Sequence, residues 1–319
     1  MMGRKRVLVV GGTGYLGQHL LQGLEKLQTK PYDLAFTHHS NNPPQPLTDA
    51  ISPSLAFRID LETGHGLSAI SEAFGQPHVI VNCAALSVPR ACEMNPSAAM
   101  AVNVPHSLVK WLSSFTETPL LIHLSTDQVY EGVKSFYKEE DETVPVNVYG
   151  KSKVEAEQYI SINCLNYAIL RSSIIYGPHT ISPVPKSLPI QVARSVLNQK
   201  DKVDFFHDEF SSDYTIKNVV DTYFVFMSKL ICAKGRHMQL LLNVGGPDRV
   251  SRVQMAEAVA SVRGHNSSFI KPVSASSPSV NRGVKSPADI SMDISRLIQV
   301  LDVTPTSFID GVRLTLASS

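Results

Sequence analysis

The sequence of 319 residues has little cysteine, no excess of charge of either sign and no long apolar run. Its four cysteines form no CxxC pair and have no metal-ligand spacing with histidine, so we expect neither a disulfide framework nor a metal site. The 29 Lys and Arg against 28 Asp and Glu leave a net charge of +1, which attracts neither nucleic acid nor an anionic membrane surface. No apolar run reaches 18 residues, and the stretch after the basic start is too short for a signal peptide. These absences predict a cytoplasmic protein with no nucleic-acid or membrane partner.

Short apolar runs alternate with amphipathic stretches along the first half of the chain. Buried strands are expected at residues 7–10, 33–37, 55–59, 78–81 and 120–124. Three segments rich in proline, serine or glycine are expected to be loops: 40–54, 175–189 and 266–280. This pattern predicts an α/β fold, a doubly wound parallel sheet (Rossmann) with a smaller C-terminal substrate-binding lobe.

Glycines follow the first predicted strand at once. The run Gly11-Gly12-Thr13-Gly14-Tyr15-Leu16-Gly17 stands between that strand and an amphipathic helix over 15–26. In such a loop Gly11 makes the turn, Gly14 lets the backbone approach a pyrophosphate, and Gly17 lets helix and strand pack closely. The helix N-terminus supplies N–H groups and a positive dipole. We predict a dinucleotide-binding loop; the alternative is an ordinary glycine-rich turn.

The end of the second predicted strand bears on the choice of cofactor. An NAD site usually has Asp or Glu here to hold the ribose 2′-hydroxyl. This strand ends in His38-His39-Ser40, with no acid to repel a 2′-phosphate. NADP(H) is therefore favoured over NAD(H), with His38, His39 or Ser40 as donors to the phosphate. Two solvent-exposed histidines are the alternative reading.

A hydroxyl-rich strand end and a Tyr–Lys pair make up the candidate catalytic residues. Thr126 and Asp127 follow the predicted strand over 120–124, and Tyr149 and Lys153 are four residues apart on a predicted helix, on one face. A free tyrosine has a pKa near 10, and a nearby ammonium group lowers that pKa. Thr126 is expected to donate to a substrate oxygen while Tyr149 exchanges its proton. A packed tyrosine beside a solvated lysine is the alternative.

Taken together, these motifs resemble those of the extended short-chain dehydrogenase/reductase family. The matching residues are Gly11 to Gly17, Asp60-Leu61, Asn82 to Ala85, Asn103, Ser125 to Asp127, Tyr149 to Lys153, Arg171 and Tyr176 to Pro178. The sequence is most similar to the dTDP-4-dehydrorhamnose reductase branch, which also contains the regulatory β subunit of methionine adenosyltransferase. The resemblance is strong through Pro178 and weaker from there to Arg282.

The resemblance implies a role for each matching position. The catalytic set would be Thr126, Tyr149 and Lys153. The cofactor-binding residues would be Gly11, Thr13, Gly14, Tyr15, Leu16, Gly17, His38, Asp60, Leu61, Cys83, Ala84, Ala85, Ser87, Asn103, Tyr149, Lys153 and Ser173. Residues 1–178 would mainly form the NADP-binding Rossmann domain. Residues 179–319 would mainly form the substrate-binding lobe, with some segments returning to the sheet.

The function implied is NADP(H)-dependent reduction of a nucleotide-linked 4-keto-6-deoxy sugar, with hydride delivered to C4. A second hypothesis is a non-catalytic regulatory subunit that binds the methionine adenosyltransferase catalytic subunit, and a homodimer is common in the family. A third is sugar-nucleotide epimerisation, which would need Cys92 or His179 as acid and base. Dehydration is disfavoured because Gln128 stands where the related dehydratases have a titratable glutamate.

Overall fold

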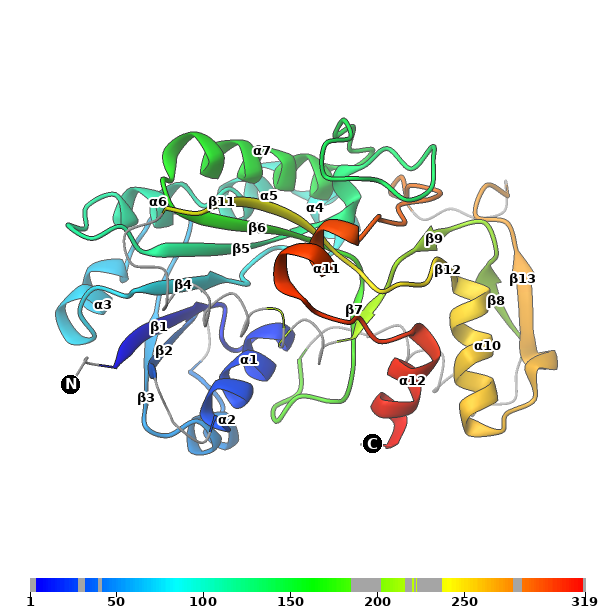
Figure 1. Cartoon of the computed structure of the whole chain (residues 1–319), viewed down its shortest axis with the longest axis horizontal. Helices are drawn as coiled ribbons and strands as arrows, with labels where there is room; N and C mark the ends of the chain where they lie inside the picture. The colour runs from blue at the N-terminus through cyan, green and yellow to red at the C-terminus, as the bar shows by residue number, and fades with distance from the viewer. Residues whose placement is uncertain are drawn as a thin grey trace.

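The computed structural model describes residues 4–27, 32–39, 42–184, 202–215, 220, 222, 237–277 and 283–317. Its centre is a seven-stranded parallel sheet in the order β11-β6-β5-β4-β1-β2-β3 (Figure 1). The strands are β1 (Lys5–Val10), β2 (Tyr32–His38), β3 (Ser54–Arg58), β4 (Val79–Asn82), β5 (Leu120–Thr126), β6 (Tyr167–Ser172) and β11 (Gln239–Val244). The order reverses between β1 and β4, and open parallel sheets bind ligands at the carboxyl end of such a switch point. The predicted doubly wound α/β fold is confirmed.

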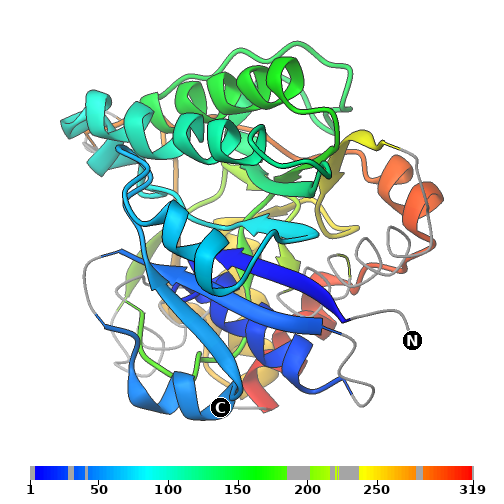
Figure 2. The ribbon, with the colours of Figure 1, turned by 90° about the vertical axis from the view of Figure 1, so that its left-hand side faces the viewer.

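Helices cover both faces of the sheet (Figures 1 and 2). One face packs against α1 (Tyr15–Glu25), α2 (Gln45–Ala50) and α11 (Ser295–Leu301). The other face packs against α3 (Leu67–Ala73), α6 (His106–Leu112) and α7 (Val148–Asn163), and α7 also contacts α4 (Pro89–Met94) and α5 (Pro96–Asn103). Val7 and Val9 of β1 enter the first core while Leu8 and Val10 enter the second. This double burial explains why β1 is a continuous apolar run.

A second, smaller core lies toward the C-terminal end of the chain. It contains α10 (Arg252–Arg263) and α12 (Phe308–Ala317), with side chains from β12 and β13. The short strands pair as β7 (Ile175–Tyr176) with β10 (Tyr214–Thr215), β9 (Phe210–Ser211) with β12 (Val250–Ser251), and β8 (Val203–Phe206) with β13 (Ile270–Val273). A capping box of Ser251 and Gln254 begins α10, and Gly264 ends it in a left-handed conformation. Between these segments, β11 returns to the main sheet.

Three local predictions were wrong. The expected loop over 40–54 contains α2, which begins beside Pro46 and buries Leu47. A single buried leucine among prolines does not produce the repeating apolar pattern from which a helix is predicted. The expected loop over 266–280 contains the 3₁₀ turn η2 (Ser267–Phe269) and β13, because β8 supplies a parallel partner from a distant part of the chain. The strand over 55–59 is not buried: β3 is the sheet edge, and Leu55 is 43% exposed. Residues 175–184 are mostly irregular as expected, and 185–189 lie outside the described residues.

No helix within the described ranges is both long and apolar enough to cross a membrane.

Candidate active site

The glycine turn between β1 and α1 is a tight loop whose shape requires glycine. Gly11 has a positive φ of 79°, and its N–H donates to Thr37 Oγ1 at 3.0 Å, which ties the loop to β2. A Cβ atom on Gly12 would lie 2.6 Å from Phe36 Cβ, and one on Gly17 would overlap the carbonyl oxygen of Gly11. At Gly12 and Gly17 the loop therefore packs against the sheet and the start of α1 without space for a side chain.

The N-terminus of α1 faces the carboxyl edge of the sheet from this loop. Gly14 is the exposed N-cap, and no side chain caps the first N–H groups of the helix. The hydroxyl of Tyr15 donates to Pro178 O at 3.0 Å, while the side chain of Leu16 is buried in the core. Leu16 can therefore offer a ligand only its backbone N–H. An uncapped helix N-terminus after a glycine turn fits the charge and shape of a pyrophosphate.

Other predicted cofactor residues follow β3 and β4 at the same edge. Asp60 comes two residues after β3, and its Oδ1 accepts from the N–H groups of Glu62 at 2.9 Å and Thr63 at 3.4 Å. Leu61 is half-buried. The residues that follow β4 are partly exposed: Cys83, Ala84, Ala85 and Ser87. Ser173, just beyond β6, is 5% exposed.

Asn103 lies beneath this edge and holds it in place. Only 1% of the residue is exposed. Its Oδ1 accepts from Leu86 N at 2.7 Å, and its Nδ2 donates to Leu86 O at 3.1 Å and to Ser152 Oγ at 2.8 Å. Both polar atoms of the amide bond within the protein, so Asn103 positions the segment after β4 against α7.

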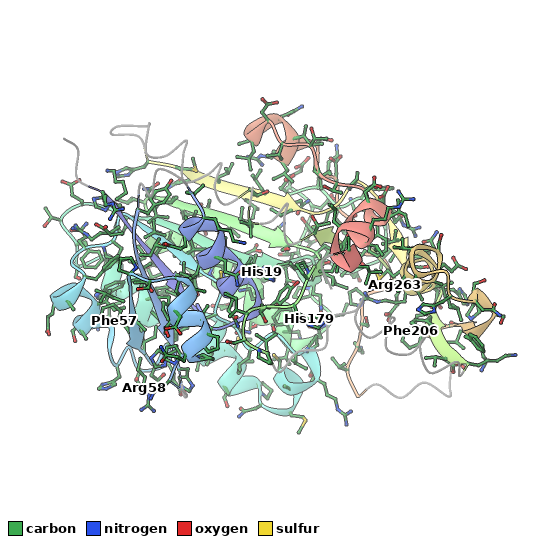
Figure 3. All side chains as sticks on the ribbon, turned by 90° about the horizontal axis from the view of Figure 1, so that it is seen from below. His19, Phe57, Arg58, His179, Phe206 and Arg263 are labelled. Carbon is green, nitrogen blue, oxygen red and sulfur yellow. The ribbon has the colours of Figure 1, made fainter. Side chains whose placement is uncertain are left out.

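The end of β2 has a basic neighbour that sequence reasoning missed. His38 is buried, His39 is exposed, and Ser40 lies outside the described residues. Arg58, the last residue of β3, is the register partner of His38, and its Nε donates to His39 O at 3.0 Å. Arg58 is exposed at the outer edge of the sheet (Figure 3). The sequence contained a signal, because Arg58 falls within the expected third strand, but only the strand order places it beside β2.

Two caps fix the first turn of α7, which carries Tyr149 and Lys153. The side chain of Asn147 accepts from Gly150 N at 2.8 Å, and Glu93 Oε1 accepts from Val148 N at 2.8 Å. A Cβ atom on Gly150 would overlap the carbonyl oxygen of Gln128, so α7 approaches the end of β5 closely. This packing brings the start of α7, with Tyr149, against the end of β5, which carries Thr126.

Thr126 does not present its proton as expected. Its hydroxyl donates to Asp127 Oδ1 at 3.1 Å and accepts from Gln128 N at 3.3 Å. Because a hydroxyl has one proton, Thr126 has none left for a substrate oxygen while it donates to Asp127. The expectation that Thr126 donates directly to a substrate oxygen is corrected for this arrangement.

The side-chain nitrogen of Lys153 lies beside a histidine. Lys153 is 1% exposed, and its Nζ is 2.9 Å from His123 Nε2. Burial lowers the pKa of Lys153 to about 8, an effect that the Glu157 carboxylate opposes. Burial raises the pKa of Tyr149 well above its usual value. The expected lowering of the tyrosine pKa by Lys153 is therefore not what the structure shows.

Two further hydrogen bonds orient the His123 ring. Asn82 Oδ1 accepts from Ala84 N at 3.2 Å, so Asn82 Nδ2 is the group 3.2 Å from His123 Nδ1. Nδ1 is then the acceptor and Nε2 carries the ring proton, facing Lys153. Burial and the neighbouring Lys153 hold the pKa of His123 far below its usual value. This donor order disfavours the ammonium form of Lys153, in the same direction as the lowering of its pKa by burial.

Glu157 does not neutralise Lys153, because its carboxylate already has a cationic partner. Arg171 Nη2 donates to Glu157 Oε2 at 2.7 Å, and Ser125 Oγ donates to Oε1. Arg171 also donates to Tyr130 Oη at 3.0 Å. Within the part of the chain that the structure describes, Lys153 forms no ion pair.

Of the two candidate residues for epimerisation, Cys92 is not prepared for proton abstraction. The Cys92 thiol donates to Leu86 O at 3.2 Å, and burial raises its pKa. His179 is exposed and lies near His19 (Figure 3). Among the described residues, no group of three or more His, Cys, Asp or Glu is arranged to hold a metal ion.

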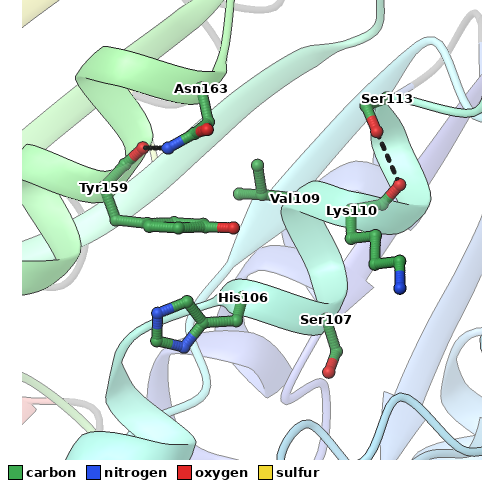
Figure 4. Close-up of a pocket in the computed structure, with 7 residues that line it drawn as sticks. All are labelled: His106, Ser107, Val109, Lys110, Ser113, Tyr159 and Asn163. Carbon is green, nitrogen blue, oxygen red and sulfur yellow. Dashed lines mark hydrogen bonds between the residues drawn. The ribbon is translucent and has the colours of Figure 1, made fainter.

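A separate surface hollow of about 290 Å³ lies between α6 and α7 (Figure 4). Its lining residues are His106, Ser107, Val109, Lys110, Ser113, Tyr159 and Asn163. The rings of His106 and Tyr159 meet edge to face, 4.4 Å between centroids. None of the candidate catalytic residues lines this hollow.

Comparison with known proteins decides the family. Residues 5–319 match the family described as RmlD substrate binding domain. The chain belongs to this family. The predicted membership of the extended short-chain dehydrogenases/reductases, in the dTDP-4-dehydrorhamnose reductase branch, is thereby confirmed.

Relatives of this RmlD-type chain fall into two groups. Methionine adenosyltransferase 2 subunit beta from Bos taurus is 27% identical, over 98% of this chain and 87% of that protein. The dTDP-4-dehydrorhamnose reductase of Sinorhizobium fredii is also 27% identical, over 58% of this chain and 61% of that protein. A probable low-salt glycan biosynthesis reductase of Haloferax volcanii is 35% identical over 45% of this chain and 48% of that protein.

Solved structures share the fold over nearly the whole chain. The dTDP-4-dehydrorhamnose reductase of Bacillus anthracis, in complex with NADP, has a TM-score of 0.77 at 20% identity and covers 99% of this chain and 100% of that one. UDP-glucose 4-epimerase of Thermotoga maritima has a TM-score of 0.80 at 18% identity, covering 98% of both chains. Both an epimerase and a reductase are thus built on this backbone, and the side chains at the site must distinguish the activities.

Proposed function

We propose that this protein is an NADP(H)-dependent reductase of a nucleotide-linked 4-keto-6-deoxy sugar. The observation that carries the proposal is the close packing of the start of α7, with Tyr149 and Lys153, against the carboxyl end of β5, on the sheet edge that also carries the glycine loop. We further propose that residues 1–178 mainly bind the cofactor and residues 179–319 mainly bind the substrate.

The cofactor would be held by the residues whose geometry fits it. The turn at Gly11, the N-terminus of α1 and the partly exposed segment after β4 would hold the dinucleotide. The bound reduced nicotinamide supplies the hydride. An Arg58 guanidinium beside His38, with no acid at the end of β2, favours a 2′-phosphate and so NADP(H) over NAD(H).

Tyr149 is the proton donor in this mechanism. Its raised pKa keeps the phenol protonated at neutral pH, and the alkoxide that forms at C4 is a stronger base than a phenolate. The phenol O–H bond breaks as the sugar O–H bond forms. The Asn147 cap fixes the turn of α7 that carries Tyr149, and Lys153, at the next turn, is the residue that would orient the cofactor ribose.

NADPH oxidation by the pure protein tests this function. dTDP- and UDP-4-keto-6-deoxyglucose are the substrates, and Tyr149→Phe is the variant, because it removes only the hydroxyl. We expect turnover with one nucleotide sugar, loss of turnover in the variant and unchanged NADPH binding. Turnover that survives in Tyr149→Phe would contradict the assignment of Tyr149.

A second candidate function rests on the breadth of one match. Methionine adenosyltransferase 2 subunit beta aligns with 98% of this chain, whereas the rhamnose reductase of Sinorhizobium fredii aligns with 58%. In this case the protein binds the methionine adenosyltransferase catalytic subunit, and Tyr149 and Lys153 are retained without a catalytic role. Co-purification with that subunit, together with altered kinetics of that enzyme, would support it. No retention and unchanged kinetics would discard it.

A further inference from the structure

A buried histidine interrupts the apolar run of β5. The exposed fraction of His123 is 0%, and like Leu121 it lies on the face of the sheet that α7 covers. An apolar side chain would fill this core position without the cost of burying two ring nitrogens. The proposed mechanism does not use His123, although the ring contacts one of the residues assigned to the cofactor.

The register of the sheet places Asn82 opposite His123. The two residues are partners on β4 and β5, and Asn82 Nδ2 is 3.2 Å from His123 Nδ1. The amide cannot be turned round, because Asn82 Oδ1 accepts from Ala84 N at 3.2 Å. His123 Nδ1 therefore accepts, and Nε2 carries the proton that faces Lys153 Nζ at 2.9 Å. A line of hydrogen bonds thus joins the segment after β4 to Lys153.

This line of hydrogen bonds is sensitive to the charge of Lys153. An amine nitrogen has a lone pair that accepts from His123 Nε2, whereas an ammonium group only donates. Protonation of Lys153 therefore moves the ring proton to Nδ1, where it meets the Asn82 amino group. Turning the amide to receive that proton would break its bond with Ala84 N. The geometry couples the charge of Lys153 to the backbone after β4.

Two other titratable groups lie near Lys153. Glu157, one turn further along α7, is held by Arg171, whose Nη2 donates to Glu157 Oε2 at 2.7 Å. The Cys83 thiol follows β4 and stays protonated, because burial raises its pKa to about 12. Burial lowers the pKa of Lys153 to about 8, and Glu157 opposes this. Lys153 can therefore change its charge while Cys83 remains neutral.

We propose that His123 is a positioning residue that couples the charge of Lys153, through Asn82, to the segment after β4, and so sets the preference of the site between reduced and oxidised dinucleotide. This inference rests on the cofactor site of the proposed function. The reduced nicotinamide ring is neutral and the oxidised ring carries a positive charge. The ammonium form of Lys153 therefore disfavours the oxidised cofactor, and the amine form removes this repulsion.

Nitrogen NMR of the imidazole rings tests the coupling without any cofactor. The signals of His123 are assigned by their absence in His123→Gln. At high pH the wild-type ring should carry its proton on Nε2, and the proton should move to Nδ1 as pH falls through the titration of Lys153. In Lys153→Met the proton should stay on Nε2 throughout. A wild-type ring whose tautomer does not change with pH would overturn the proposal.

The affinity for NADP+ relative to NADPH tests the consequence at the cofactor site. In the wild type this ratio should rise about fivefold as pH increases through the titration of Lys153, since the phosphates titrate in both dinucleotides and cancel. Asn82→Asp places an acceptor opposite Nδ1, which keeps the ring proton there and favours the ammonium form of Lys153. The rise should then move up by about one pH unit or more.

Two lysine variants provide the controls. Lys153→Met should abolish the pH dependence of the affinity ratio. Lys151→Met removes an exposed lysine of the same helix and should leave the pH dependence unchanged. If Asn82→Asp does not fold, the His123 tautomer in the wild type and in Lys153→Met still decides the question.

The outcomes separate this inference from the proposed function. A wild-type protein that binds neither dinucleotide would overturn both. NADPH oxidation that depends on Tyr149, with an affinity ratio that is the same at every pH, would overturn the role of His123 alone. A ratio that rises at the same pH in the wild type and in Asn82→Asp would do so too.

Discussion

The Lys153 Nζ atom lies 2.9 Å from His123 Nε2, in a place where neither group is exposed to water. The contact joins α7 to β5 through two titratable side chains. Burial lowers the pKa of both, because it disfavours their charged forms. Burying Lys153 therefore lowers the free energy of unfolding. Such a loss of stability is expected where function requires a buried polar group.

Replacing this lysine should stabilise the protein at neutral pH. The pKa of Lys153 is about 8 in the fold against 10.5 when exposed, so the unfolded chain binds the proton more tightly. The penalty is fully present below pH 8 and disappears as pH rises toward 10.5. Lys153→Met should raise the free energy of unfolding at pH 7 by about 2 kcal/mol. Urea denaturation should show this gain shrinking between pH 8 and 10.

Lys151 provides the matched control, because it lies on the same helix but is exposed. Lys151→Met should leave the free energy of unfolding nearly unchanged at every pH. A Lys153→Met protein that is less stable than the wild type at pH 7 would contradict the inferred penalty.

Arg58 should discriminate NADPH from NADH. Arg58→Gln removes the cation beside His38 and should weaken NADPH binding by about tenfold, with little effect on NADH. The NADPH affinity of the wild type should also fall with added salt, since the guanidinium is exposed. Calorimetric titration with both nucleotides measures the ratio. Arg263→Gln, far from Arg58 in Figure 3, is the control; equal losses for both nucleotides would argue against a phosphate contact.

Two glycines of the loop should separate binding from stability. Gly14 has an ordinary φ of −75°, and a Cβ there would meet only the Gly11 carbonyl oxygen at 3.2 Å. Gly14→Ala should fold nearly as well as the wild type but lose at least tenfold in NADPH affinity. Gly17→Ala should also destabilise the fold, because its Cβ would overlap Gly11 and lie 2.7 Å from Gly12 Cα. Thermal unfolding and fluorescence titration of NADPH report the two effects; tight NADPH binding by Gly14→Ala would contradict the assigned loop function.

The buried ion pair of Glu157 and Arg171 should be sensitive to the loss of one partner. Their side chains are 8% and 5% exposed. Glu157→Gln leaves the guanidinium without a counter-charge and should lower the free energy of unfolding by about 3 kcal/mol. At the surface, Asp310→Asn breaks an exposed pair with Arg313 and should have no measurable effect. Similar denaturation midpoints for the two variants would show that burial does not control this interaction.

The sequence by itself determined five strands of the seven-stranded sheet, the glycine turn and the order of the candidate catalytic residues. These features are local: a continuous apolar run marks a strand buried on both faces, and the steric demands of the loop at Gly11 and Gly17 are met only by glycine. The spacing of Tyr149 and Lys153 follows from the helical repeat. Such signals need no knowledge of distant neighbours.

Only the tertiary structure decided which groups meet across elements. Strand order placed Arg58 beside His38, and the packing of α7 on β5 brought Lys153 to His123 instead of leaving it to act on Tyr149. The Thr126 hydroxyl donates to Asp127. Asp213, more than 80 residues further along the chain, also lies near the Asp127 carboxyl group. Charges, hydrogen-bond directions and burial depend on what lies nearby in space, and spacing along the chain carries no record of that.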